Sequence, residues 1–475
     1  MNVRKPIKLL LPVFCFMACT GKKPTTDTGN IDTVNTIVPA TTIVHDTFAP
    51  GKVIAQVFCK NDAAQSYSLY IPVKGNNEAL PVIYFFDPHA DGALPLNKYK
   101  ALADKYNFIL VGSNNSKNGN DWPTAENIWR SLFDDTQKRL EINSNRIYAC
   151  GFSGGAKVAG HIALNYSEVK AVIANGAGLP DETPPGNFNF TFTAIAGEGD
   201  MNMTDLVAFS SELDKTKTKH RILLFDGKHE WAPESTMNIA FAGLQLDAMR
   251  GKIIPADNIF INDFIAKSKQ QINAYTAANK LVKAEQECKL SLSMLDGLTT
   301  ERTWFKEKDA SVTNNPAYKK QWQTERNLFT TEQNIKAGYM QQFQGGGMSY
   351  WSKTINDLQT KAKGTSAEAA MYQRLLAYLS LAFYSISNRL IASNQNNDAQ
   401  HFVELYKMAD ATNSEAWYFS AILNARSNNV KATKDDLLKA VDLGFNDKNR
   451  MIQQPEFMNL AAQINFAMLE SKMKK

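Results

Sequence analysis

The chain lacks the features that mark several large classes of protein. Its formal net charge is only +5 over 475 residues, and it contains no block of lysines and arginines. Because nucleic-acid-binding surfaces concentrate positive charge, we expect no nucleic-acid partner. Beyond the N-terminus, no apolar run looks long enough to cross a membrane. With 44% hydrophobic and 21% charged residues, the composition is that of an ordinary globular protein.

Cysteine is also scarce, with five residues in the whole chain. Cys59, Cys150 and Cys288 are the three that follow Cys19, and they are widely spaced. An odd number at such spacing forms no disulfide framework, and the spacing does not suit a zinc site. We therefore expect neither a disulfide scaffold nor a bound cofactor.

The N-terminus has the layout of a targeting segment. A basic start precedes a short apolar stretch, residues 9–18, which is too short to span a bilayer. The junction Ala18-Cys19, followed by polar residues, resembles a bacterial lipobox. The resemblance implies a signal peptide over 1–18 and lipidation of Cys19, so that the protein is exported and anchored to a bacterial membrane. An ordinary signal peptide cleaved elsewhere is the alternative.

Three further segments differ in their patterns. Residues 19–46 are rich in Thr, Asp, Asn and Pro, which is typical of a flexible tether. Over 47–250, short apolar runs alternate with helix-like segments, which predicts a mostly parallel sheet with helices on both faces. Over 251–475 the strand-like runs disappear and helical spacing dominates, which predicts an all-α domain. Within it, the run Gly345-Gly346-Gly347 is expected to separate two helices.

The last part of the chain shows a weak internal repeat. At an offset of 35 residues, apolar positions recur in two segments, Phe402, Val403, Leu405 and Tyr406, then Leu437, Leu438, Ala440 and Val441. Such recurrence indicates stacked helical hairpins. The segment resembles a degenerate tetratricopeptide repeat, with Thr433 where a small alanine is usual. An unrelated helical bundle is the alternative.

The most informative motif lies at residues 146–155. The strand-like Ile147-Tyr148-Ala149-Cys150 leads into Gly151, Ser153 and Gly155, and a helix-like segment follows at once. Strand, sharp turn, serine and helix make up a nucleophile elbow, which exposes the serine Oγ at the carboxyl edge of a sheet. The flanking glycines are needed because a side chain there would collide with the neighbouring strand and helix.

A serine nucleophile needs a base within hydrogen-bonding reach. Only six histidines are present, and the position in the pattern argues against five of them, namely His45, His89, His161, His220 and His401. His229 directly follows an apolar strand-like run, residues 221–225. That places it at the same sheet edge as Ser153, so His229 is the expected base.

The base in turn needs a carboxylate to orient it. Residues 192–196 form a strand-like run, and Glu198 and Asp200 follow it. We choose Asp200 as the acid, and Glu198 is the alternative. The order Ser153, Asp200, His229 is the α/β-hydrolase order of nucleophile, acid and base.

The surrounding residues resemble a known family. Arg146-Ile147-Tyr148 running into the elbow, with His229-Glu230-Trp231 downstream, looks like the polyhydroxybutyrate-depolymerase, feruloyl-esterase and dienelactone-hydrolase side of the α/β-hydrolases. The resemblance covers about residues 50–250. It implies an α/β-hydrolase sheet and hydrolysis of a small-molecule or polymer-linked ester, in which Ser153 attacks the carbonyl, His229 moves the proton and Asp200 holds the imidazole.

The oxyanion hole departs from this family. One donor should be the backbone N–H of Gly154, and the second should come from the loop after residues 82–86. Relatives often have His-Gly there, whereas this chain has Asp87-Pro88-His89. Because Pro88 has no N–H, Asp87 or His89 remains as the second donor. The loss of one donor typically costs about 10²–10³ in rate.

The same loop also suggests a metal site. Asp87, His89 and Asp91 alternate, and these residue types suit a divalent cation. Since no second cluster of ligands accompanies them, turn chemistry is the better interpretation, and we assign no metal.

Two classes of function follow from the sequence. The first is a membrane-anchored serine esterase with a helical accessory domain, and the same triad would also suit a peptidase. The alternative is a scaffold lipoprotein, silent or weakly catalytic, whose residues 251–475 recruit a protein partner through a concave helical surface.

Overall fold

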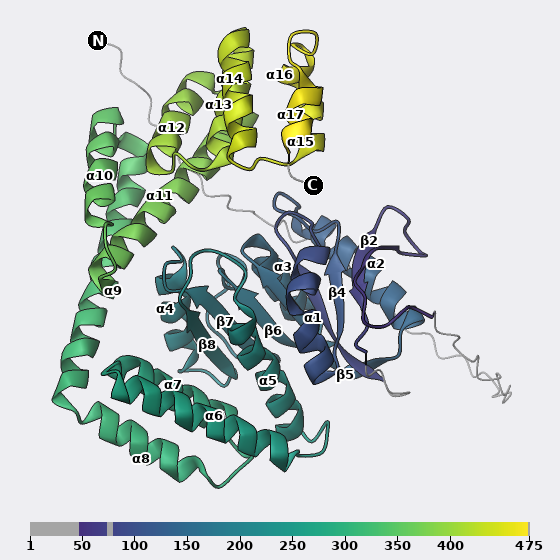
Figure 1. Ribbon diagram of the computed structural model, residues 1–475, viewed down its shortest axis with the longest axis vertical. Helices are drawn as coiled ribbons and strands as arrows, with labels where there is room; N and C mark the ends of the chain where they lie inside the picture. Colours follow the sequence, from purple (N-terminus) through teal and green to yellow (C-terminus); the bar gives the residue numbers. More distant parts are fainter. Residues whose placement is uncertain (1–46, 74–78, 474–475) are drawn as a thin grey trace, which may run out of the picture.

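The computed structural model describes residues 47–73 and 79–473 (Figure 1), so the predictions for the signal peptide, Cys19 and the tether lie outside the described residues. One sheet organises the first half of this chain. Its strands are β1 (Ile54–Phe58), β2 (Ser66–Tyr70), β3 (Leu80–Phe86), β4 (Ile109–Ser113), β5 (Ile142–Phe152), β6 (Val169–Asn175), β7 (Thr191–Gly197) and β8 (His220–Phe225).

The strand order identifies the fold. The sheet runs β1-β2-β4-β3-β5-β6-β7-β8. Strand β2 is antiparallel to both of its neighbours, and every pair from β4 to β8 is parallel. A parallel sheet with this exchange of β3 and β4 and an antiparallel second strand is the α/β-hydrolase sheet, so the predicted fold class is confirmed.

Helices cover both faces of the sheet, as the alternating pattern predicted. The side chains of β3 alternate between two hydrophobic clusters, with Ile83 and Phe85 in one and Val82, Tyr84 and Phe86 in the other. This alternation explains the continuous apolar run, because a strand buried on both faces has no polar side. The first face carries α1 (Ala93–Tyr106) and α5 (Glu234–Arg250), and the second carries α2 (Trp122–Arg139), α3 (Gly154–Asn165) and α4 (Met203–Leu213).

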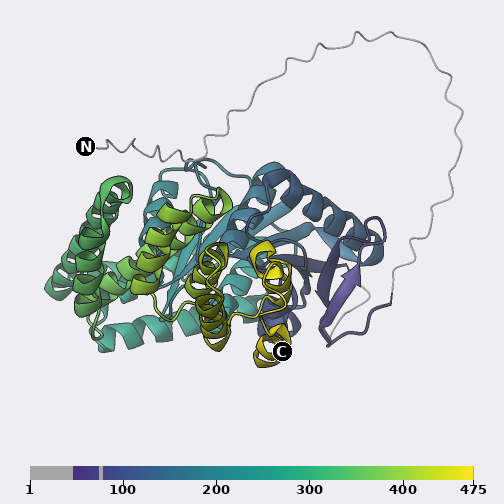
Figure 2. The same cartoon turned by 90° about the horizontal axis from the view of Figure 1, so that it is seen from above.

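After α5 the described chain is entirely helical. Helix α9 runs along one side of the α/β part, and the later helices continue above it (Figure 1). Seen from above, they lie across the α/β part (Figure 2). The helices are α6 (Asn258–Ala277), α7 (Leu281–Met294), α8 (Arg302–Thr313), α9 (Pro316–Gly345), α10 (Met348–Lys361), α11 (Ala367–Ala392), α12 (Asn396–Ala409), α13 (Ser414–Arg426), α14 (Val430–Asp442), α15 (Lys448–Gln453), α16 (Pro455–Met458) and α17 (Phe466–Lys472).

Helix α11 is more apolar than the sequence analysis allowed for. By length and composition alone it could cross a membrane. In the structure, however, its apolar side chains Leu375, Leu379 and Phe383 are buried in a third hydrophobic cluster with α10, α12 and α13. The helix also carries the buried, ion-paired Arg374. Part of its apolar surface is therefore packed within the helical region, and 39% of its most apolar 18-residue stretch is buried.

The repeat positions occupy equivalent places in two helical hairpins. Helix α12 pairs with α11, and α14 pairs with α13. The aligned apolar residues lie on α12 and α14, and all but Leu438 are buried. The glycine run also separates two helices, since α9 ends at Gly345 and α10 begins at Met348.

The hydrophobic core does not divide at residue 250, where the pattern changes from strands to helices. Helices α6, α7 and α8 contribute Ile265, Ile272, Cys288 and Phe305 to the same cluster as β3, α1 and α5. The third cluster draws its buried residues from positions 339 to 469. The first helices after residue 250 thus pack as a further layer on one face of the sheet.

This continuity of the core can be tested with two isoleucines of α6. Ile272 is fully buried and Ile259 is 84% exposed. We expect Ile272→Ala to lower the free energy of unfolding by about 2–5 kcal/mol, because it leaves a cavity in the shared core. Ile259→Ala should change it by less than about 0.5 kcal/mol. Urea unfolding followed by tryptophan fluorescence measures both, and equal effects would contradict the shared core.

Candidate active site

The backbone of Ser153 is bent into an unusual conformation at the junction of β5 and α3. Its φ is 53° and its ψ is −120°. A non-glycine residue at positive φ costs on the order of 1–3 kcal/mol and persists only where its surroundings hold it. The Ser153 N–H donates to the carbonyl of Asn175 at 2.8 Å, which ties the turn to the neighbouring strand β6. The expected elbow is therefore present, with the serine at the carboxyl edge of the sheet.

The flanking glycines are needed for the reason the sequence suggested. A Cβ at Gly151 would lie 2.0 Å from the carbonyl oxygen of Gly155. A Cβ at Gly155 would lie 1.9 Å from the carbonyl oxygen of Phe86 on β3. Both obstacles are backbone atoms in the interior, so neither can move aside without displacing a strand or a helix.

Three side chains that follow the ends of β5, β7 and β8 form a hydrogen-bonded chain. Ser153 Oγ lies 3.0 Å from His229 Nε2, and His229 Nδ1 lies 2.9 Å from Asp200 Oδ2. The His229 side chain is 23% exposed, whereas that of Asp200 is fully buried. The imidazole can thus exchange protons with a substrate on one side while a sealed carboxylate fixes its other nitrogen.

The structure shows which of the two candidate carboxylates, Asp200 or Glu198, contacts His229. Asp200 Oδ1 accepts a hydrogen bond from the N–H of Asn202 at 2.8 Å, which leaves Oδ2 directed at His229. Glu198 points elsewhere and forms an ion pair with Lys283 of α7. Of these two carboxylates, only Asp200 contacts the imidazole.

Three other described histidines, His161, His220 and His401, belong to other parts of the fold. The His161 ring stacks on Trp122 at 4.3 Å, and its Nε2 lies 3.0 Å from Glu126. His220 opens β8 and His401 lies within α12. His45 lies outside the described residues.

The backbone N–H groups expected to bind the oxyanion differ in whether they already have a hydrogen-bond acceptor. Gly154 is the first residue of α3, so its N–H is among those that a helix leaves without an internal acceptor. The N–H of His89 instead donates to Asp87 Oδ1 at 2.8 Å, which occupies it. Of the two alternatives for the second donor, this leaves the Asp87 N–H.

Asp87 links the loop after β3 to the loop that carries His229. Its buried carboxylate also accepts a hydrogen bond from Trp231 Nε1 at 2.9 Å. Burial alone would raise the pKa of the Asp87 carboxyl, but hydrogen bonds from His89 and Trp231 outweigh it and hold the pKa below its usual value. The contact between the Asp87 carboxylate and the His89 side chain in turn raises the pKa of His89, with a smaller contribution from Glu415 of α13.

Trp231 is a core residue that also walls the site. Only 7% of it is exposed. Its ring lies 5.6 Å from that of Phe152, which in turn lies 4.8 Å from the His229 ring. These tilted aromatic contacts support the loop that carries His229.

Two supporting residues were missed by the sequence analysis. Gly176 follows β6 with a φ of +65°, and a Cβ there would lie 3.1 Å from both Asp200 Oδ2 and His229 Cε1. Asn202 donates from its side chain to the carbonyl of Gly176 at 2.7 Å. A glycine directly after a strand at the catalytic edge was the available signal for Gly176, because such a position often requires a close approach.

The polar loop after β3 makes turn contacts. Asp91 Oδ1 accepts a hydrogen bond from the N–H of Leu94 at the start of α1, and Asp87 is held by His89 and Trp231. Within residues 47–73 and 79–473, no three His, Cys, Asp or Glu side chains are grouped as metal ligands would be.

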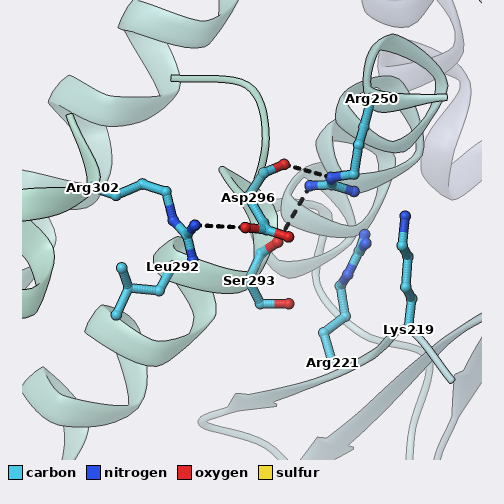
Figure 3. Close-up of a pocket in the computed structure, with 7 residues that line it drawn as sticks. All are labelled: Lys219, Arg221, Arg250, Leu292, Ser293, Asp296 and Arg302. Carbon is cyan, nitrogen blue, oxygen red and sulfur yellow. Dashed lines mark hydrogen bonds and ion pairs between the residues drawn. The ribbon is translucent and has the colours of Figure 1, made fainter. Parts of the chain in front are cut away.

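A cavity of about 300 Å³ lies at the opposite edge of the sheet (Figure 3). Its basic side chains are Lys219, Arg221, Arg250 and Arg302. Arg221 stands at the start of β8, whereas His229 follows the end of that strand, so the cavity does not include Ser153. Arg221 pairs with Asp247, and Arg302 pairs with Asp296, so much of its charge is neutralised within the fold.

Comparison with known proteins gives likenesses of fold over about two fifths of the chain. No model of a protein family matches, and no curated protein matches by sequence. Among solved structures, fluorophosphonate-binding serine hydrolase F of Staphylococcus aureus is 11% identical and covers 41% of this chain and 99% of its own, with a TM-score of 0.34. An esterase from Pyrobaculum calidifontis is 11% identical over 42% of this chain and 87% of its own, with a TM-score of 0.35. Est1E from Butyrivibrio proteoclasticus is 12% identical over 41% and 99%, with a TM-score of 0.33.

Adjacent glycines of the elbow should differ in their tolerance of a methyl group. At Gly154 the nearest obstacle to a Cβ is Oδ1 of the exposed Asn118, 1.9 Å away, which can rotate. At Gly155 the nearest obstacle is the carbonyl oxygen of Phe86 on β3, which cannot rotate away. We therefore expect Gly155→Ala to lower the free energy of unfolding by about 1–3 kcal/mol and Gly154→Ala to change it by less than about 0.5 kcal/mol. Urea unfolding of the two variants measures the difference, and a larger loss for Gly154→Ala would contradict it.

Proposed function

We propose that this protein is a serine hydrolase that cleaves carboxylic esters through an acyl-enzyme on Ser153. The single observation that carries the proposal is the continuous chain from Ser153 Oγ through His229 to the buried Asp200 carboxylate. A serine hydroxyl is a poor nucleophile unless a base takes its proton, and this geometry supplies the base and its orienting group together.

The first half of the reaction forms the acyl-enzyme. Ser153 Oγ attacks the ester carbonyl carbon while its proton moves to His229 Nε2. Asp200 keeps His229 Nδ1 protonated and stabilises the imidazolium that results. When the tetrahedral intermediate collapses, the C–O bond to the alcohol breaks and His229 returns the proton to the leaving oxygen.

The oxyanion formed in that step needs hydrogen-bond donors. The N–H of Gly154 supplies one, and we assign the Asp87 N–H as the second. The hydrogen bond between His89 N–H and the Asp87 side chain stabilises the turn that presents this group. Water then enters, loses a proton to His229 and attacks the acyl carbon. When the bond from this carbon to Ser153 Oγ breaks, His229 returns the proton to Oγ, so the acid is released and Ser153 is restored.

Removal of the nucleophile tests the proposal directly. We expect Ser153→Ala to lower kcat for a short-chain aryl ester at least about 10³-fold and to abolish labelling by a fluorophosphonate. Ser211→Ala is a matched control on the exposed face of α4, where the hydroxyl bonds only the carbonyl of Val207. Equal ester hydrolysis by the wild type and Ser153→Ala would overturn the assignment.

One observation favours a second candidate function, a weakly catalytic or silent scaffold. Pro88 offers no N–H and that of His89 is occupied, so the loop after β3 has few free donors for an oxyanion. In that case the helical region, residues 251–475, would recruit a protein partner. A folded protein whose Ser153 is not labelled by the fluorophosphonate would favour this function.

We further propose that the protein is exported and lipid-anchored through Cys19, on the strength of the Ala18-Cys19 junction. In a bacterial host, the full-length chain should incorporate a clickable fatty-acid analogue and partition into a detergent phase. Cys19→Ala should lose both properties because the acceptor sulfur is gone. Labelling that persists in Cys19→Ala would place the lipid elsewhere or exclude this anchor.

A further inference from the structure

The loop that carries Asp200 is contacted from outside the α/β part. This loop joins β7 to α4, and α9 and α11 of the helical region reach it with two basic side chains. Arg374 Nη1 donates to the carbonyl of Glu198 at 2.7 Å. Lys336 Nζ donates to the carbonyl of Met201 at 2.7 Å and to Thr204 Oγ1 at 3.0 Å. The two contacted carbonyls lie on either side of Asp200 in the chain.

A buried glutamate pairs with both of these basic side chains, and Asp205 of α4 lies 3.6 Å from Lys336 Nζ. Glu332 on α9 is fully buried, and its carboxylate accepts hydrogen bonds from Arg374 Nε at 3.0 Å and Nη2 at 2.7 Å. Its other oxygen lies 3.2 Å from Lys336 Nζ. The side chains of Arg374 and Lys336 are only 8% and 7% exposed. The three groups therefore form one desolvated network.

Such a network is a costly way to obtain stability alone. The desolvation of each ion is unfavourable, and well-packed apolar residues of similar volume are often as stabilising. An ionic network does, however, hold its donors in fixed directions. Here the donors point at main-chain carbonyl oxygens of the loop that carries Asp200.

Asp200 depends on this loop for its position. On the inner side, the Asp200 N–H bonds the carbonyl of Gly197, and Asn202 ties the turn to Gly176. On the outer side, the helical region supplies the ties from Arg374 and Lys336 to the main chain, together with the ion pair between Lys283 and the Glu198 side chain. A displacement of about 1 Å in a catalytic group can cost on the order of 100-fold in rate, so both sides of the turn matter.

We propose that Arg374 and Lys336, held in place by Glu332, are positioning residues for Asp200. The helical region thereby completes the active site of the α/β part. This inference rests on the proposed function for its kinetic readout. The two helices hold the carboxylate in register with His229 and take no part in bond making.

The first test compares buried arginines inside and outside the network. Arg374→Gln should lower kcat for the aryl ester about 10- to 100-fold and leave KM unchanged, because Asp200 is misplaced while the substrate site is not. Arg426→Gln is the matched control. Arg426 is 16% exposed and pairs with Glu456 of the helical region, without a hydrogen bond to the loop. Equal losses of kcat in both variants would overturn the proposal.

A double-mutant cycle then asks whether Arg374 acts through Asp200. Asp200→Asn alone should lower kcat about 10⁴-fold. If Arg374 only positions that carboxylate, Arg374→Gln should cause little further loss in the Asp200→Asn background. Full additivity of the two losses would show that Arg374 acts by another route and would overturn the proposal.

Two further measurements keep the outcome clear. If Arg374→Gln fails to fold, Arg374→Lys retains the charge beside Glu332 but loses the guanidinium group that reaches Glu198, and it should show the same fall in kcat.

Proton NMR provides a readout without substrate, because a His229 Nδ1–H bonded to Asp200 gives a strongly downfield resonance. That resonance should be lost or shifted in the Arg374 variant and retained in Arg426→Gln. An unshifted resonance would overturn the positioning role, whereas a wild type that shows the resonance but hydrolyses no ester would overturn only the proposed function.

Discussion

The positive φ of Ser153 is the constraint on which the rest of the site depends. A strand that enters a helix through this conformation sends the serine side chain out of the sheet edge, and it does so only if the neighbouring positions carry no side chain. The cost of the strained backbone is offset by the hydrogen bond from Ser153 N–H to Asn175 and by the packing of α3 on the sheet. With Oγ fixed in this way, His229 reaches it from the loop that follows β8, and Asp200 reaches His229 from the loop that follows β7.

The electrostatics of the site follow from unequal burial. A fully buried carboxylate, Asp200, faces a partly exposed imidazole, His229. The Asp200 carboxylate holds the imidazole through the hydrogen bond to Nδ1, at a place from which water is excluded. Because the Asp200 side chain is fully buried, protein groups alone surround it. Its position therefore depends on how the loop that carries it is held.

The helical half contributes to that support in two ways. Its first helices complete the core on one face of the sheet, because α6 and α7 belong to the same hydrophobic cluster as α5. Helices α9 and α11 then bring buried charges to the acid loop at the carboxyl edge. The later helices continue above that edge (Figures 1 and 2). An α/β sheet and an all-helical extension are therefore joined by packing and by polar contacts close to the triad.

The sequence by itself determined the local features of this protein. The buried strands, the elbow glycines and the order of Ser153, Asp200 and His229 were readable because short apolar runs and turn residues act over a few positions. Only the tertiary structure decided between Asp200 and Glu198, directed the His89 N–H to Asp87 and brought Arg374 to Glu198 across 176 residues. A buried lysine or arginine on a helix looks like a surface charge in the sequence, because its partner lies on another element. The direction of a loop N–H likewise depends on the contacts that fold the loop.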